Sequence, residues 1–408
     1  MKSRTVALLV AIIAACGVPL TAQRPSDAAV RLTERLKAAV DRGDVPGVVV
    51  IAADRNRVIY QGAFGFRDKG HRVPMTTDTI FRIASMTKAV TSAAVMQLVE
   101  RGRVRLDDPA DKFLPAFRHL QVVDSFSSAT GAYTLHAAKR PPTVRELLTH
   151  TSGLAYNFVS ATVRDFKPRN GDTFEAGPLI FDPGQRWHYG PSTWWLGKLV
   201  EAASGKTLEA YVHDNISSPL GMRDTGFNVP AQDQSRVSTL STREHGALLE
   251  QPPAPIPVVT EYRGDGGLFS TALDYIRFEQ MVLNDGQLNG ARIVSANTIE
   301  AMTTNQIGAL NVPALKTAMP ERSNDFTFVD DGRDKWSLAF LITSRETPGT
   351  RSAGSLSWGG IDNTYYWIDP RRGVAGVIMM QFLPFADAKA LSVYDTFERG
   401  TYEILNGK

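Results

Sequence analysis

A serine and a lysine one helical turn apart could together do nucleophilic chemistry. Ser85 stands where a short apolar run, residues 80–84, gives way to a helical pattern that continues to Arg101. Lys88 follows three positions later, so its amine can reach back to the Ser85 hydroxyl. Because a serine hydroxyl is a poor nucleophile until a neighbour takes its proton, and a desolvated lysine can take it, this spacing predicts an activated serine. The same pair would also fit a helix-capping serine followed by a solvated lysine, so a site needs further elements.

A tyrosine further along the chain could supply a second proton-transfer group. Tyr189 lies at the end of a loop, where Gly190 and Pro191 shape the backbone before a helix begins. A neighbouring lysine charge would favour its phenolate, which could then carry a proton from Ser85 to a leaving group. The alternative is an aromatic side chain that only covers the start of the helix.

A strand near the C-terminus could supply the third element. Residues 356–361 have a strand-like pattern that carries Trp358 and the paired glycines Gly359 and Gly360. Glycines in a strand let a ligand approach the backbone closely, and an exposed N–H there could join that of Ser85 in an oxyanion hole. The alternative is a β-bulge beside a core tryptophan.

The elements that must position these residues are strands near both ends of the chain and helices between them. The pattern predicts helices at 26–42, 85–101, 192–203, 208–215, 272–284 and 386–405, and strands at 48–53, 58–66, 336–344, 352–357, 364–368 and 373–382. Residues 121–140 and 160–178 show no strong periodicity and are predicted to be surface loops. Distant strands with few between them indicate one antiparallel sheet, so the fold class is α/β (α+β), with helices on the sheet and a mainly helical part inserted.

These segments together resemble a known family. Ser85-Met86-Thr87-Lys88, Tyr189 and Trp358-Gly359-Gly360 occur in the order, and at roughly the separations, of class C β-lactamases and their esterase relatives. The resemblance extends to segments at 147–154, 219–222 and 266–271, and it covers about residues 28–405. The branch that the chain resembles most is that of the family VIII carboxylesterases.

The resemblance implies roles and a fold. Ser85 would be the acylated nucleophile, Lys88 and Tyr189 the base pair, and the backbone N–H groups of Ser85 and Ile361 the oxyanion hole. Trp358, Gly359 and Gly360 would bind substrate. The implied fold is that of β-lactamases and transpeptidases. It divides residues 23–408 into an α/β part, about 23–105 and 262–408, and a helical part, about 106–261.

Two departures from the family pattern concern the substrate. Pro191 stands where true class C β-lactamases have an asparagine, and Trp358 stands where they have a lysine. Without that cation, the carboxylate of a β-lactam or a D-Ala-D-Ala peptide loses a favourable partner. We therefore expect the partner to be a small-molecule ester or amide substrate, with a neutral, fairly hydrophobic ester favoured over a penicillin. The alternatives are β-lactamase or D-Ala-D-Ala peptidase activity, acyl transfer to an alcohol, and a catalytically silent ligand-binding protein.

The N-terminus reads as a leader for export. Lys2 and Arg4 precede an almost wholly apolar stretch, and small residues follow up to Ala22. We expect a signal peptide over residues 1–22 and a periplasmic or secreted protein. In the alternative interpretation, Cys16 is the lipidated first residue of a lipoprotein.

Composition excludes several other classes. The chain has 408 residues, 43% of them hydrophobic, and a formal net charge of +3. It has no Lys/Arg run that would indicate nucleic-acid binding, and we expect no membrane-spanning segment. The seven histidines show no metal-ligand spacing and the one cysteine lies in the predicted leader, so we expect neither a metal nor a cofactor.

Overall fold

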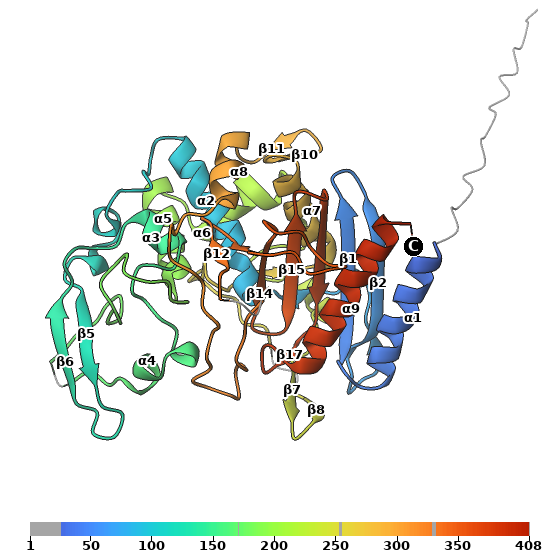
Figure 1. Ribbon diagram of the computed structural model, residues 1–408, viewed down its shortest axis with the longest axis horizontal. Coiled ribbons are helices and arrows are strands. Elements are labelled where there is room, and N and C mark those ends of the chain that lie inside the picture. Colours follow the sequence, from blue (N-terminus) through green and yellow to red (C-terminus); the bar gives the residue numbers. More distant parts are fainter. Residues whose placement is uncertain (1–25, 170, 253–254, 329–331, 408) are drawn as a thin grey trace, which may run out of the picture.

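An eight-stranded antiparallel sheet forms the centre of the computed structural model (Figure 1). The structure describes residues 26–407 except 170, 253–254 and 329–331, so the predicted signal peptide and Cys16 lie outside the described residues. The strands of the sheet, in spatial order, are β12 (Lys335–Trp336), β13 (Leu341–Ile342), β14 (Leu356–Gly360), β15 (Thr364–Asp369), β16 (Val374–Met379), β1 (Gly47–Asp54), β2 (Val58–Asp68) and β3 (Val73–Pro74). The pairing of β1 with β16, which sets Val50 against Ile378, joins the two ends of the chain in one sheet.

Strand β1 has buried side chains on both faces of the sheet. All but the last of its residues are buried, as expected of an apolar run without alternation. Val48 and Val50 pack in the cluster that includes helices α1 (Asp27–Asp41) and α9 (Ala388–Leu405). Val49 and Ile51 pack in the larger cluster, which includes α2 (Thr87–Glu100) and α7 (Ala272–Leu283). The predicted antiparallel sheet flanked by helices is therefore confirmed.

The described part of residues 106–261 contains four α-helices and two strand pairs. The helices are α3 (Val144–Leu148), α4 (Ala161–Asp165), α5 (Ser192–Ser204) and α6 (Leu208–Val212). The strand pairs are β5 (Gln121–Phe126) with β6 (Tyr133–Ala137), and β7 (Ser241–Glu244) with β8 (Ala247–Glu250). The prediction that 121–140 is a surface loop is wrong, because a hairpin forms there and buries Val122 and Tyr133. The predicted boundaries between an α/β part and a helical part stay a prediction.

Short elements complete the fold. They are β4 (Phe81–Arg82), β9 (Phe269–Ser270), β10 (Gln287–Leu288), β11 (Ala291–Arg292), α8 (Ala296–Thr303) and β17 (Phe382–Leu383). The single strand predicted at 336–344 is instead β12 and β13, because the Ser337 hydroxyl accepts from the N–H groups of Ala339 and Phe340 and turns the chain between them. Within the described ranges, no helix combines the length and apolarity that crossing a membrane requires.

Helix α7 carries a carboxyl group into the core. Glu279 is fully buried, and neither of its oxygens has a hydrogen-bond partner among the described residues. Burial raises the pKa of this carboxyl well above its usual range, so the folded protein holds Glu279 protonated. The unfolded chain instead loses this proton at its ordinary pKa.

This difference predicts a pH-dependent stability. Above the ordinary pKa, the unfolded state binds fewer protons at Glu279 than the folded state, so the free energy of unfolding falls by about 1.4 kcal/mol per pH unit until the folded pKa is reached. Glu279→Gln cannot ionise, so its stability relative to wild type should rise between pH 5 and 8 in urea denaturation experiments. Glu34→Gln, an exposed change on α1, is the control and should track wild type. A constant gap between Glu279→Gln and wild type would contradict the prediction.

Candidate active site

Ser85 lies on a tight turn between a strand and a helix. Strand β4 pairs with β9, a 3-10 turn spans Ala84–Met86, and α2 then begins at Thr87. Ala84 has a φ of 44°, in the left-handed region that an alanine adopts only at a cost. The turn thereby presents Ser85 at the start of α2, as the sequence pattern predicted.

The Ser85 hydroxyl contacts both predicted proton-transfer groups. Lys88 Nζ lies 3.0 Å from Ser85 Oγ, and the Tyr189 hydroxyl donates to the same oxygen at 2.6 Å. The indole Nε1 of Trp358 donates to the Tyr189 hydroxyl at 3.3 Å. The structure therefore brings together the three distant segments that the sequence singled out.

Lys88 is a buried amine with four polar or aromatic neighbours. Its residue exposure is 3%. Nζ donates to the Tyr156 hydroxyl at 3.1 Å and to the Asp265 carbonyl at 2.7 Å, and it lies 4.8 Å from the centre of the Tyr189 ring. Aromatic faces stabilise a desolvated cation, so the pocket suits a charged amine that water does not reach.

Tyr189 is held by the backbone around it. The Tyr156 N–H donates to its carbonyl at 3.2 Å, and the next residue, Gly190, has no room for a Cβ because the Leu154 carbonyl occupies that space. The ring packs against Trp358, with 5.0 Å between centroids. These contacts direct the phenol at Ser85, in place of the alternative in which it only covers a helix start.

One glycine of β14 meets a packing requirement that the sequence did not indicate. A Cβ on Gly360 would collide with the backbone carbonyl of Ile83 and the hydroxyl of Thr364. Gly360 therefore lets the strand approach the segment before Ser85, and the expectation that it admits a ligand is not needed to explain it. Gly359 lines the cavity described next.

A narrow, mainly apolar pocket opens onto Ser85. Its lining residues are Ser85, Phe158, Val159, Tyr189, Leu315, Ser323, Phe326, Trp358, Gly359, Ile361 and Phe385. The predicted oxyanion-hole residue Ile361 and the predicted substrate-binding Trp358 are thus in the same cavity as the nucleophile. None of the lining residues is charged.

Two residues of the site were not predicted. Tyr156 donates to Asp265 Oδ2 at 2.5 Å while it accepts from Lys88. Asp265 has a residue exposure of 3% and also accepts from the guanidinium of Arg263. Tyr156 closely follows the segment 147–154 that resembles the family, so proximity to that segment was the available signal.

The ionisable groups of the site have shifted pKa values. Burial alone would raise the pKa of Asp265, but the nearby charges of Lys88 and Arg263 outweigh it and lower the pKa. Burial, together with the Asp265 charge, raises the pKa of Tyr156 well above its usual range. Burial, then the Lys88 charge, lowers the pKa of His150 far below its usual range, so its ring packs against Tyr189 in the neutral form.

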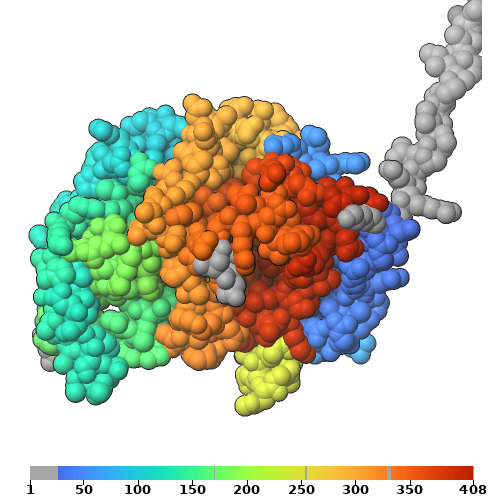
Figure 2. Space-filling model, viewed as in Figure 1, coloured from blue at the N-terminus to red at the C-terminus, as the bar shows by residue number. Residues whose placement is uncertain are grey.

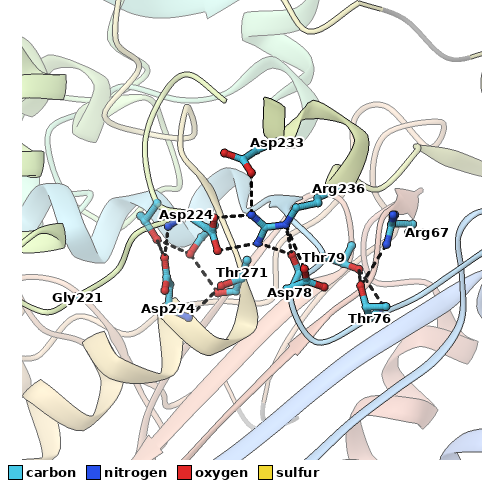
Figure 3. Close-up of polar contacts among 12 residues, drawn as sticks. Arg67, Thr76, Asp78, Thr79, Gly221, Asp224, Asp233, Arg236, Thr271 and Asp274 are labelled. Atoms are coloured by element: carbon cyan, nitrogen blue, oxygen red, sulfur yellow. Dashed lines mark hydrogen bonds and ion pairs between the residues drawn. The ribbon is translucent and has the colours of Figure 1, made fainter. Parts of the chain in front are cut away.

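A cluster around Arg236 fastens the segment that leads into Ser85 (Figure 3). The guanidinium forms ion pairs with Asp78, Asp224 and Asp233. Figure 3 shows these carboxylates converging on Arg236 from separate segments. The backbone of Arg236 also accepts from the Ile80 N–H at 3.0 Å. One guanidinium thereby ties residues 78–80, which precede β4, to residues 224–236, which follow α6.

The cluster continues to the start of α7. The Asp224 N–H donates to Asp274 Oδ2 at 2.7 Å, and the Thr271 hydroxyl caps the helix by accepting from the Asp274 N–H. Burial raises the pKa of Asp274 to about 6. Since β9 immediately precedes this cap and pairs with β4, the cluster fixes both the strand that leads into the Ser85 turn and its partner strand. Within the described ranges, no cluster of three or more His, Cys, Asp or Glu residues could hold a metal ion.

Comparisons with known proteins agree with this geometry. Monacolin J acid methylbutanoyltransferase of Aspergillus terreus is 29% identical to this chain and covers 95% of it and 98% of its own length. Lovastatin esterase of Penicillium rubens is 30% identical and covers 90% of this chain and 96% of its own length. The structure of simvastatin synthase from Aspergillus terreus, in its LovD6 mutant, has a TM-score of 0.77 at 28% identity and covers 94% of this chain and 96% of its own.

The likeness to that structure over nearly the whole of both chains confirms the predicted β-lactamase/transpeptidase-like fold. A family model described as Beta-lactamase matches residues 32–395. Because this match spans most of the chain, the protein belongs to the Beta-lactamase family, as the resemblance of its sequence motifs implied.

Proposed function

We propose that the protein is a serine hydrolase that cleaves small, neutral carboxylic esters through an acyl-Ser85 intermediate. The observation that carries the proposal is the pair of contacts on Ser85 Oγ, from Lys88 Nζ at 3.0 Å and from the Tyr189 hydroxyl at 2.6 Å. A hydroxyl within hydrogen-bond reach of an amine and a phenol can pass its proton to that pair as it attacks a carbonyl carbon.

The reaction then runs in two balanced halves. Ser85 Oγ bonds to the ester carbonyl carbon, its proton moves to the Lys88–Tyr189 pair, and the N–H groups of Ser85 and Ile361 donate to the oxyanion. The bond to the leaving alcohol breaks as that alcohol takes the proton. In the second half, a water oxygen bonds to the acyl carbon and gives its proton to the same pair. The bond from that carbon to Ser85 Oγ then breaks, Oγ takes the proton back from the pair, and the carboxylic acid leaves.

The uncharged lining of the cavity supports a neutral ester over a β-lactam or a D-Ala-D-Ala peptide. Trp358 occupies the place of the lysine in class C enzymes, and no lining residue offers a cation to a substrate carboxylate. The second candidate is acyl transfer to an alcohol, which differs only in the acceptor of the second half. The likeness to monacolin J acid methylbutanoyltransferase favours it.

Steady-state rates on the purified protein test the proposal. We expect hydrolysis of short-chain p-nitrophenyl esters, slow or absent nitrocefin turnover, and a covalent fluorophosphonate adduct at Ser85. Added alcohols separate the two candidates, because a transferase forms a new ester faster than it releases free acid. Nitrocefin cleaved faster than every ester would favour a β-lactamase, and a folded protein without an adduct would favour a silent binding protein.

We also propose that the protein is exported, because the first 22 residues have the composition of a leader. The mass of the protein isolated from the periplasm or medium tests this. Cleavage after Ala22 and lipidation at Cys16 would give different N-termini.

A further inference from the structure

Lys88 has more polar contacts than a simple base toward Ser85 requires. A lysine Nζ has three directions besides its bond to the side chain, and the structure fills all three: the Asp265 carbonyl at 2.7 Å, the Tyr156 hydroxyl at 3.1 Å and Ser85 Oγ at 3.0 Å. The Asp265 carbonyl can only accept a hydrogen bond. Two of the partners therefore determine where the third direction of the amine points.

The hydroxyl of Tyr156 is also an acceptor toward Lys88. Its own proton is engaged by Asp265 Oδ2 at 2.5 Å, so only a lone pair faces Nζ. Asp265 is kept in place by Arg263, whose guanidinium donates to both carboxylate oxygens at 3.2 and 2.9 Å. Asp265 therefore acts on Lys88 in two ways. Its backbone carbonyl accepts a hydrogen bond from Nζ directly, and its carboxylate accepts one from Tyr156, which in turn contacts Nζ.

The charged groups around Lys88 determine whether its buried amine is stabilised as an ammonium. Burial at 3% exposure disfavours an ammonium unless a negative charge compensates it. The titratable and charged groups that face Lys88 are Ser85, Tyr156, Tyr189, His150, Asp265 and, behind Asp265, Arg263. Of these, only Asp265 is a carboxylate, and a neutral His150 adds no charge. The negative charge that supports the ammonium therefore comes from Asp265, one hydrogen bond away through Tyr156.

We propose that Tyr156 and Asp265 are positioning residues that hold Lys88 as a cation and aim it at Ser85 Oγ. This inference rests on the proposed function for its catalytic meaning, since Lys88 matters only if Ser85 reacts. With Lys88 charged, the oxygen of Tyr189, as a phenolate, is the group that takes the Ser85 proton. Tyr156 itself does not reach the reacting atoms; it acts through Lys88.

Titration of Lys88 tests the proposal without requiring activity. In protein labelled with [13C]lysine, the Cε resonance of Lys88, assigned by its absence in Lys88→Met, reports loss of the ammonium proton. Tyr156→Phe keeps the ring but leaves one N–H of Lys88 without its acceptor, so we expect the midpoint to fall by about one pH unit. Asp265→Asn removes the negative charge and should lower the midpoint further. Tyr211→Phe, which removes a phenol that accepts from Arg101 far from the site, should leave the midpoint unchanged.

The pH profile of kcat/KM for ester hydrolysis gives the functional counterpart. If Lys88 must be charged, its alkaline limb should move to lower pH in Tyr156→Phe and further in Asp265→Asn, while the Tyr211→Phe profile stays in place. Unchanged Lys88 midpoints in both variants would overturn the proposal, and so would a shift of the acid limb in place of the alkaline one. A wild-type protein without a fluorophosphonate adduct would instead refute the proposed function, and the NMR midpoints would still decide the role of Tyr156 and Asp265.

Discussion

Ser85→Ala is expected to abolish ester hydrolysis and covalent labelling, with a loss in kcat of roughly 10⁴-fold or more, as found when the nucleophile of a serine hydrolase is removed. The reason is geometric: Ser85 Oγ lies within hydrogen-bond distance of both Lys88 Nζ and the Tyr189 hydroxyl. Alanine keeps the backbone of the Ala84–Met86 turn and removes only that oxygen. Ester turnover and intact-protein mass after fluorophosphonate treatment measure the effect.

A second serine of the same cavity serves as the control. Ser323 also lines the cavity, but its hydroxyl donates to the Asn324 carbonyl at 2.8 Å, and no base contacts it in the described part of the chain. Ser323→Ala should therefore keep the adduct at Ser85. If the adduct persists in Ser85→Ala, or disappears in Ser323→Ala alone, Ser85 is not the nucleophile and the prediction is wrong.

The sequence predicted best what depends on short spacings. Ser85 and Lys88 share one helical turn, and a cap or glycine marks the ends of several helices. Thr143 and Glu146, three positions apart, form a capping box with both reciprocal hydrogen bonds present. Such features depend on residues three or four positions apart, so the chain near them holds the necessary information.

Contacts between distant segments were predicted only where a family motif marked them. Tyr189 and Trp358 were found by resemblance, because nothing in their local sequence distinguishes a catalytic tyrosine from one that covers a helix. Tyr156 and Asp265 were missed for the same reason: they are 109 positions apart, and their hydrogen bond exists only after the fold brings them together. Gly360 was singled out from its sequence, but its packing against the Ile83 carbonyl was not foreseen, and its predicted contact with a substrate stays a prediction.

The β5–β6 hairpin was missed because its pattern is weak. Val122 is buried while Asp124 and Ser125 are exposed, and a hydrogen bond joins Asp124 to His136 across the strands. A strand stabilised by backbone pairing and surface hydrogen bonds shows little hydrophobic alternation, so periodicity alone does not find it.

Tyr189→Phe is expected to lower kcat/KM for ester hydrolysis by roughly 10²- to 10⁴-fold, the range that a positioned acid–base group contributes. Phenylalanine keeps the ring contacts with Trp358 and His150 but removes the hydroxyl that lies 2.6 Å from Ser85 Oγ. Lys88 would remain beside the nucleophile, so a residual rate above that of Ser85→Ala is expected. Rates of p-nitrophenyl ester hydrolysis, with circular dichroism to verify the fold, measure the effect.

Tyr60→Phe separates this effect from the general loss of a buried phenol. Tyr60 shares a 3.0 Å hydrogen bond with Thr33 between β2 and α1, away from the cavity, so its removal should leave the rate unchanged. If Tyr189→Phe retained more than about a tenth of wild-type activity, the Tyr189 hydroxyl would not be the group that transfers the proton, since acid–base groups contribute at least about 10²-fold. Lys88 would then have to accept the Ser85 proton as a neutral amine, which its contacts with Tyr156 and the buried carboxylate of Asp265 disfavour. The rate of Tyr189→Phe therefore tests whether Tyr189 takes the Ser85 proton, and the titration midpoint of Lys88 tests whether Lys88 is the cation beside it.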